Sequence, residues 1–87
     1  MTKIYIYCLF DTMDSFIGVY SSLKAVHRDA IKLSNRGSSS VYLFYDDKRA
    51  PPTLTALRNV FKGRCDYHVS YKSSAASIKI FKTKLKD

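Results

Sequence analysis

Residues 3–10 read KIYIYCLF, and this run decides the fold class. It is rich in β-branched and aromatic residues, which favour an extended strand. Apolar side chains occupy both of its faces, a pattern typical of a central strand covered on both sides. A polar turn, DTMD at 11–14, comes next, and FIGVY at 16–20 has the pattern of a returning strand. The chain is therefore predicted to begin with a β-hairpin.

Two later segments carry the start and stop signals of α-helices. Ser21 or Ser22 can cap the first helix by accepting the free N–H groups of its first turn, and Gly37 is placed to end it. Its apolar residues recur at helical spacing and are Leu23, Val26, Ala30 and Leu33. Thr53 can cap the second helix, and Gly63 is placed to end it. The apolar stripe of that helix consists of Leu54, Leu57, Val60 and Phe61.

Three further segments complete the pattern. Residues 41–45 (VYLFY) are apolar on both faces and predict another central strand, and residues 65–71 (CDYHVSY) alternate like a half-exposed edge strand. Residues 77–82 (SIKIFK) suit either a strand or a helix. We favour a helix, because the alternation breaks at Phe81. A helix also places one set of apolar and amphipathic residues on a single face, namely Ala75, Ile78, Phe81, Lys82 and Leu85.

The sequence thus predicts the order β-β-α-β-α-β-α. Such an order gives a compact α/β (α+β) domain in which helices pack on a small mixed sheet. Because the chain has 87 residues, we expect residues 1–87 to form a single domain with a modest core.

Positive charge is concentrated in the last thirty residues. Residues 58–87 hold eight bases and two acids, Asp66 and Asp87, so they supply +6 of the chain's net +8. A surface of this kind usually meets a polyanion, most commonly nucleic acid, although a solubilising tail would look similar. Lysine predominates and behaves as a point charge, so contacts there should be poorly selective for base sequence. The predicted nucleic-acid-binding residues are Arg58, Lys62, Arg64, Lys72, Lys79, Lys82, Lys84 and Lys86.

Signatures of catalysis and of cofactor or metal binding are weak. Asp46 and Asp47 follow a predicted central strand and could hold Mg²⁺, but turn formation explains them better because no third ligand lies nearby. A nuclease using His27 and His68 is conceivable, but the two share no spacing signature. We therefore expect a protein that is not an enzyme and that has no cofactor and no metal site.

The two cysteines, Cys8 and Cys65, lie in or beside strand-like runs, and we expect both to be buried free thiols. No apolar run reaches the 18 residues of a membrane span, and the N-terminal stretch lacks the cleavage site of a signal peptide. The chain is accordingly expected to be cytoplasmic, with no membrane partner.

The stretch FIGVYSSLKAVHRDA at 16–30, after a tyrosine-rich first strand, resembles the opening of many small bacteriophage proteins, and the resemblance covers about the first third of the chain. Small basic early proteins of T4-like phages often disarm host defences, some of them by inhibiting ribonuclease toxins. The resemblance implies a host protein, such as a ribonuclease toxin, as one partner and RNA or another nucleic acid as the second. A protein-only inhibitor that docks its basic surface on an acidic host partner is the alternative. If the final segment were an exposed strand, it could pair two copies into a homodimer.

Overall fold

The structure is a computed structural model that describes residues 4–35, 40–74 and 76–86. The elements follow in the order β1 (Tyr5–Phe10), β2 (Phe16–Tyr20), α1 (Leu23–Ser34), β3 (Tyr42–Tyr45), β4 (Lys48–Ala50), α2 (Leu54–Phe61), β5 (Tyr67–Lys72) and β6 (Ser77–Lys84). The strands form one sheet in the spatial order β2-β1-β6-β5-β3-β4. Every strand pair in it is antiparallel. The expectation of an α+β domain is thus confirmed, whereas the predicted mixed sheet and the predicted order are wrong.

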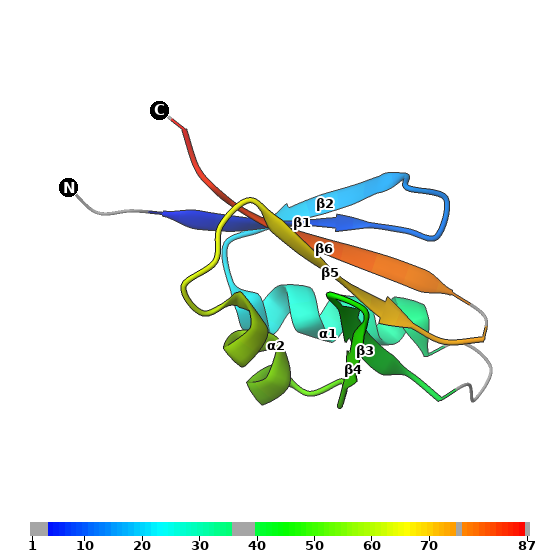
Figure 1. The fold of residues 1–87 in the computed structure, drawn as a ribbon. Helices are drawn as coiled ribbons and strands as arrows, with labels where there is room; N and C mark the ends of the chain where they lie inside the picture. Colours follow the sequence, from blue (N-terminus) through cyan, green and yellow to red (C-terminus); the bar gives the residue numbers. More distant parts are fainter. Residues whose placement is uncertain (1–3, 36–39, 75, 87) are drawn as a thin grey trace.

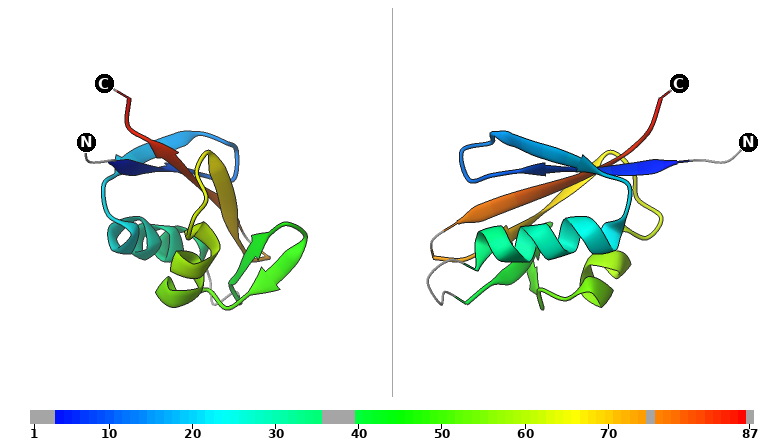
Figure 2. Two further views of the ribbon diagram at one scale, coloured as in Figure 1. Left: turned by 60° about the vertical axis from the view of Figure 1, so that its left-hand side comes forward. Right: turned by 180° about the vertical axis from the view of Figure 1, so that it is seen from behind.

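Both helices lie against the same face of the sheet (Figure 1), and the view from behind shows α1 running across it (Figure 2). Alternate residues of the inner strands point into this layer and form the core with the buried faces of the helices. The core consists of Leu9, Val26, Ala30, Leu43, Leu57, Val60, Phe61, Val69, Tyr71, Ala76, Ile78 and Ile80. No helix covers the opposite face within the described residues, so β1 is not covered on both sides as predicted.

The caps of both helices agree with the sequence. Ser22 accepts the N–H of Ala25 at 3.3 Å, and Thr53 accepts the N–H of Ala56 at 3.1 Å. Gly63 has a φ of +71° just after α2, as expected for a residue that ends a helix. Gly37, the predicted end of the first helix, lies outside the described residues.

The largest error concerns the final segment, which is the strand β6 and not a helix. It lies between β1 and β5 and pairs with both along its length. Ile78, Ile80 and Lys82 face the helices, while Lys79 and Phe81 face the other side. The apparent break in alternation at Phe81 disappears, because the uncovered face of this sheet also carries apolar rings. The predicted helical face that combined Ile78, Phe81 and Lys82 is therefore absent, and β6 cannot pair two copies because both of its edges are occupied.

Strand β4 is a second difference from the sequence prediction. Asp46 and Asp47 have φ values of +47° and +60°, and they form a two-residue turn between β3 and β4. Positive φ at both central positions is the hallmark of a type I′ hairpin turn, in which Asp is tolerated. The turn-forming interpretation of this pair is therefore confirmed. Because β3–β4 pairs with β5, the latter is an inner strand, not the predicted edge.

Candidate nucleic-acid interface

The uncovered side of the sheet, called the open face below, carries a continuous cross-strand row. The register places neighbours directly opposite one another from the β4 edge to the β2 edge. In spatial order the row reads Arg49, Phe44, Ser70, Lys79, Phe10 and Phe16. Six strands at the usual spacing of about 4.8 Å make this row roughly 24 Å long. It therefore carries three aromatic rings and two cations across the width of the molecule, with Ser70 between Phe44 and Lys79.

Shorter rows flank this one on the same face. Tyr42 lies opposite Lys72 on one side of the row, and His68 lies opposite Phe81 on the other side. His68 is exposed, and the other three are half-buried. The open face is thus a surface of aromatic rings packed side by side, with three cations among them, Arg49, Lys72 and Lys79.

Two of these cations lie directly over aromatic rings. The guanidinium carbon of Arg49 is 4.4 Å from the centroid of Tyr42, and Nζ of Lys72 is 4.4 Å from the centroid of Phe44. Both distances fall within the range in which a cation is attracted to the negative face of a ring. These contacts hold the Arg49 and Lys72 side chains on the surface without removing their charge. Each cation can therefore still pair with a phosphate.

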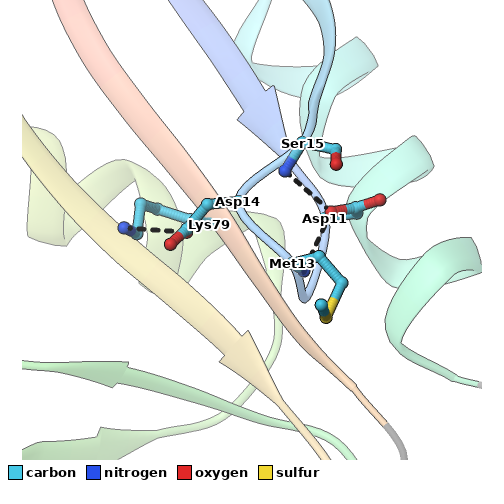
Figure 3. Close-up of polar contacts among 5 residues, drawn as sticks. All are labelled: Asp11, Met13, Asp14, Ser15 and Lys79. Atoms are coloured by element: carbon cyan, nitrogen blue, oxygen red, sulfur yellow. Dashed lines mark hydrogen bonds and ion pairs between the residues drawn. The ribbon is translucent and has the colours of Figure 1, made fainter.

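The third cation, Lys79, pairs with the turn between β1 and β2. Its Nζ lies 3.3 Å from Oδ1 of Asp14 (Figure 3). The turn itself is held by Oδ1 of Asp11, which accepts the N–H groups of Met13 and Ser15 at 2.9 Å each. The Lys79–Asp14 pair is well exposed to solvent, and pairs of this kind contribute only about 0–1 kcal/mol. A phosphate could therefore replace Asp14 at little cost.

A groove of about 360 Å³ is cut into the open face between β5 and the β3–β4 hairpin. Ser70, a small residue in the middle of the row, lines it beside Phe44, His68 and Lys72. The other end of the groove is acidic and is lined by Asp46, Asp47 and Asp66. The open face is therefore polarised, with cations at the Lys72 end and carboxylates at the far end.

Two of the acids at that end, Asp46 and Asp66, accept hydrogen bonds from neighbouring side chains. Asp46 accepts a hydrogen bond from Nη1 of Arg64 at 2.9 Å, and this contact lowers the pKa of the Asp46 carboxyl. Asp66 accepts from Oγ1 of Thr83 at 2.6 Å. Within the described part of the chain, no group of three or more His, Cys, Asp or Glu residues is arranged to hold a metal ion.

The structure separates the eight predicted binding residues. Only Lys72 and Lys79 lie on the open face. Arg58 belongs to α2 and Lys62 follows it, so both are exposed on the helix layer. Arg64 is paired with Asp46, and Lys84 and Lys86 lie at and beyond the end of β6. The predicted cations thus do not form one continuous surface.

Lys82 is the clearest departure from the predicted set. It is only 9% exposed and points into the helix layer. Its Nζ donates to the carbonyl oxygen of Phe61 at 2.9 Å, at the last residue of α2, and lies 4.6 Å from the centroid of Tyr5. A cation at a helix C-terminus is favourable because the last carbonyl groups carry partial negative charge. Lys82 therefore stabilises the fold and cannot reach a ligand.

The two histidines lie on opposite sides of the sheet and differ in burial. Nδ1 of His27 is 2.6 Å from the hydroxyl of Tyr71, which is fully buried beneath the sheet. Burial lowers the pKa of the His27 ring, which is held by this hydrogen bond to the buried Tyr71 hydroxyl. His68 is exposed on the open face, on the other side of the sheet. The two histidines therefore lie on opposite sides of the sheet and do not belong to one site.

Sequence reasoning missed Arg49 and the rings Tyr42, Phe44 and Phe81. Arg49 gives no signal in the sequence, because the short strand β4 has no apolar alternation of its own. The rings were assigned to a strand and a helix covered by other elements, although a sheet with helices on one side alone leaves half of its side chains uncovered. Both cysteines are free thiols, but neither is buried as expected, because Cys8 is half-buried and Cys65 is exposed.

Comparison of the chain with models of protein families, with curated proteins and with solved structures gives no match. Neither helix of the described residues is long and apolar enough to cross a membrane.

Proposed function

We propose that this chain is a non-enzymatic protein that binds single-stranded nucleic acid, RNA in particular, on the open face of its sheet. The observation that carries the proposal is the cross-strand row that combines rings with cations, in which Phe44 and Phe10 lie on either side of Ser70 and Lys79. Uncovered sheet faces that combine aromatic rings with Lys or Arg side chains bind single strands: nucleobases stack on the rings, and phosphates pair with the cations.

The polarity of the face supports one orientation of the strand. Arg49, Lys72 and Lys79 lie toward one side of the face, so the sugar–phosphate backbone is expected to cross the sheet there. The carboxylates of Asp46, Asp47 and Asp66 repel phosphate, but they can accept hydrogen bonds from the amino groups of bases. Bases are therefore expected to point from the backbone into the groove beside Phe44 and His68.

The wider role follows from the resemblance of residues 16–30 to early phage proteins. On that basis the protein would act in the host cytoplasm by inhibiting a nucleic-acid-handling defence factor such as a ribonuclease toxin, with RNA bound to both. The alternative, a protein-only inhibitor, predicts that the chain retains no nucleic acid by itself.

A charge-matched comparison tests the proposal. The double variant Lys72→Gln/Lys79→Gln removes two cations from the open face, and Arg58→Gln/Lys62→Gln removes two exposed cations from the helix layer. Both lower the net charge of the chain from +8 to +6. Binding to a labelled single-stranded RNA is measured by fluorescence anisotropy over a range of salt concentrations, with single-stranded DNA and double-stranded RNA in parallel.

The open-face variant is expected to bind at least tenfold more weakly. Each lost phosphate contact removes about 0.7 from the slope of log K against log salt, so the slope should fall by roughly 1.4. The helix-layer variant should bind like the wild type. Equal losses in both variants, or the absence of any binding by the wild-type protein, would refute the proposal.

A further inference from the structure

The two edges of the sheet differ in their protection against pairing with another strand. Strand β4 has only three residues, begins with Lys48 and Arg49, and is followed by two prolines. Short length, positive charge and proline are the usual features that prevent edge-to-edge association. Strand β2 has five residues and no charged side chain, and Phe16 and Val19 are 59% and 55% exposed. The β2 edge therefore offers unpaired backbone groups beside exposed apolar side chains.

The charge around β2 also favours contact between two copies. Residues 11–20 contain Asp11 and Asp14 but no lysine or arginine, and the Asp14 carboxylate pairs with Lys79. A chain with a net charge of +8 repels its own copies over most of its surface. The β2 edge is a region in which that repulsion is locally relieved.

A groove of about 220 Å³ runs beside this edge, between β2 and α1. It is lined by the apolar Ile17, Tyr20 and Leu33 and by two opposite charges, Asp29 and Lys32. Asp29 is already engaged within its own copy, because it accepts a hydrogen bond from the Tyr20 hydroxyl at 2.6 Å. A two-fold axis at an antiparallel pair of β2 strands places one such groove on each side of the axis. The apolar lining of the groove therefore extends the apolar surface beside the β2 edge.

We propose that β2 pairs with β2 of a second copy of this chain, antiparallel and about a two-fold axis, to form a symmetric dimer. The two six-stranded sheets would become one sheet of twelve strands. Phe16, the last residue of the open-face row, lies at the junction, so the two open faces would join end to end. The inference itself depends only on the β2 edge and does not require that the open face bind nucleic acid.

Self-association is measured by sedimentation equilibrium and light scattering in the absence of nucleic acid. Concentrations from about 5 to 500 μM are needed, because a pairing of two five-residue strands is expected to form a small interface of the weak class, below roughly 1,200 Å². Val19→Lys places a charge on the exposed edge. Leu85→Lys, at a residue that is 48% exposed after β6, makes the same change of charge away from the edge and serves as the control.

The wild-type mass is expected to rise from that of a monomer to twice that value, and no further, across this range. Leu85→Lys should do the same, whereas Val19→Lys should dimerise at least tenfold more weakly with an unchanged circular dichroism spectrum. If Val19→Lys fails to fold, Phe16→Lys at the same edge takes its place. A wild-type protein that stays monomeric or grows beyond a dimer overturns the inference, as does equal dimerisation of edge and control variants. A monomer that binds RNA would overturn this inference alone, and a dimer that binds none would overturn the proposed function alone.

Discussion

Replacing Lys82 by methionine should destabilise the fold while leaving the open face intact. Methionine keeps most of the apolar stem but removes the ammonium group that donates to the carbonyl oxygen of Phe61 at 2.9 Å. A hydrogen bond to a charged group contributes about 1.5–3 kcal/mol, and a cation over a ring adds about 0.5–2 kcal/mol depending on its burial. Lys82 is only 9% exposed, so the burial of its ammonium group carries a desolvation cost. Methionine removes this cost, which offsets part of the lost stabilisation. We therefore expect a net loss of about 1–2 kcal/mol in the free energy of unfolding.

Lys84→Met is the matched control, because Lys84 is in the same strand but exposed. Exposed substitutions of this kind change stability by less than about 0.5 kcal/mol. Urea unfolding followed by circular dichroism measures both variants, and thermal unfolding should show a fall of about 4–16 °C for Lys82→Met. Folded Lys82→Met should bind RNA like Lys84→Met. Equal stability of the two variants would refute the structural role assigned to Lys82, and a selective loss of binding would restore it to the interface.

Three further predictions concern the pH dependence, a turn and the open face. The folded-state pKa of His27 is lowered, so the unfolded chain binds more protons than the folded chain. Stability should therefore be lost as the pH falls below about 6.5, the ordinary pKa of histidine. Urea unfolding at pH 7.5 and 5.0 measures this loss, and a His27→Gln variant that keeps the full pH dependence would contradict the prediction. Gly63→Ala should lower the free energy of unfolding by about 1–2 kcal/mol, measured by thermal unfolding. An added Cβ meets nothing within 4 Å, so the whole penalty comes from the φ of +71°. An unchanged melting temperature would show that this conformation is not required. Phe44→Leu should weaken binding of single-stranded RNA between about fivefold and a hundredfold if a base stacks on this ring, and unchanged anisotropy titrations would remove Phe44 from the interface.

Local signals in the sequence predicted the local structure well. Ser22 and Thr53 cap the two helices, and the stripe of α2 is buried at Leu57, Val60 and Phe61. These features depend on residues within a few positions of one another. The strand β6 was mistaken for a helix because its residues suit both periodicities. What decides the matter is pairing with β1 and β5, which are distant in the sequence.

The candidate site was harder to predict for the same reason. Cations in the last third of the chain are close in sequence, but a strand sends Lys79 and Lys82 to opposite faces of the sheet. Arg49 and Phe44 join Lys79 through the register of β4, β3, β5 and β6, which a single sequence does not reveal. The charge of the chain predicted one continuous surface of cations, whereas the topology disperses them and determines which of them lie beside aromatic rings.

Photo-cross-linking of 4-thiouridine-substituted single-stranded RNA, with the adducts mapped by mass spectrometry, tests the central claim most directly. The proposed function predicts adducts on the open face, at Tyr42, Phe44, His68 or Phe81, and their loss in the Lys72→Gln/Lys79→Gln variant. Adducts confined to peptides of α1 and α2, or no adducts at any RNA concentration, would contradict it.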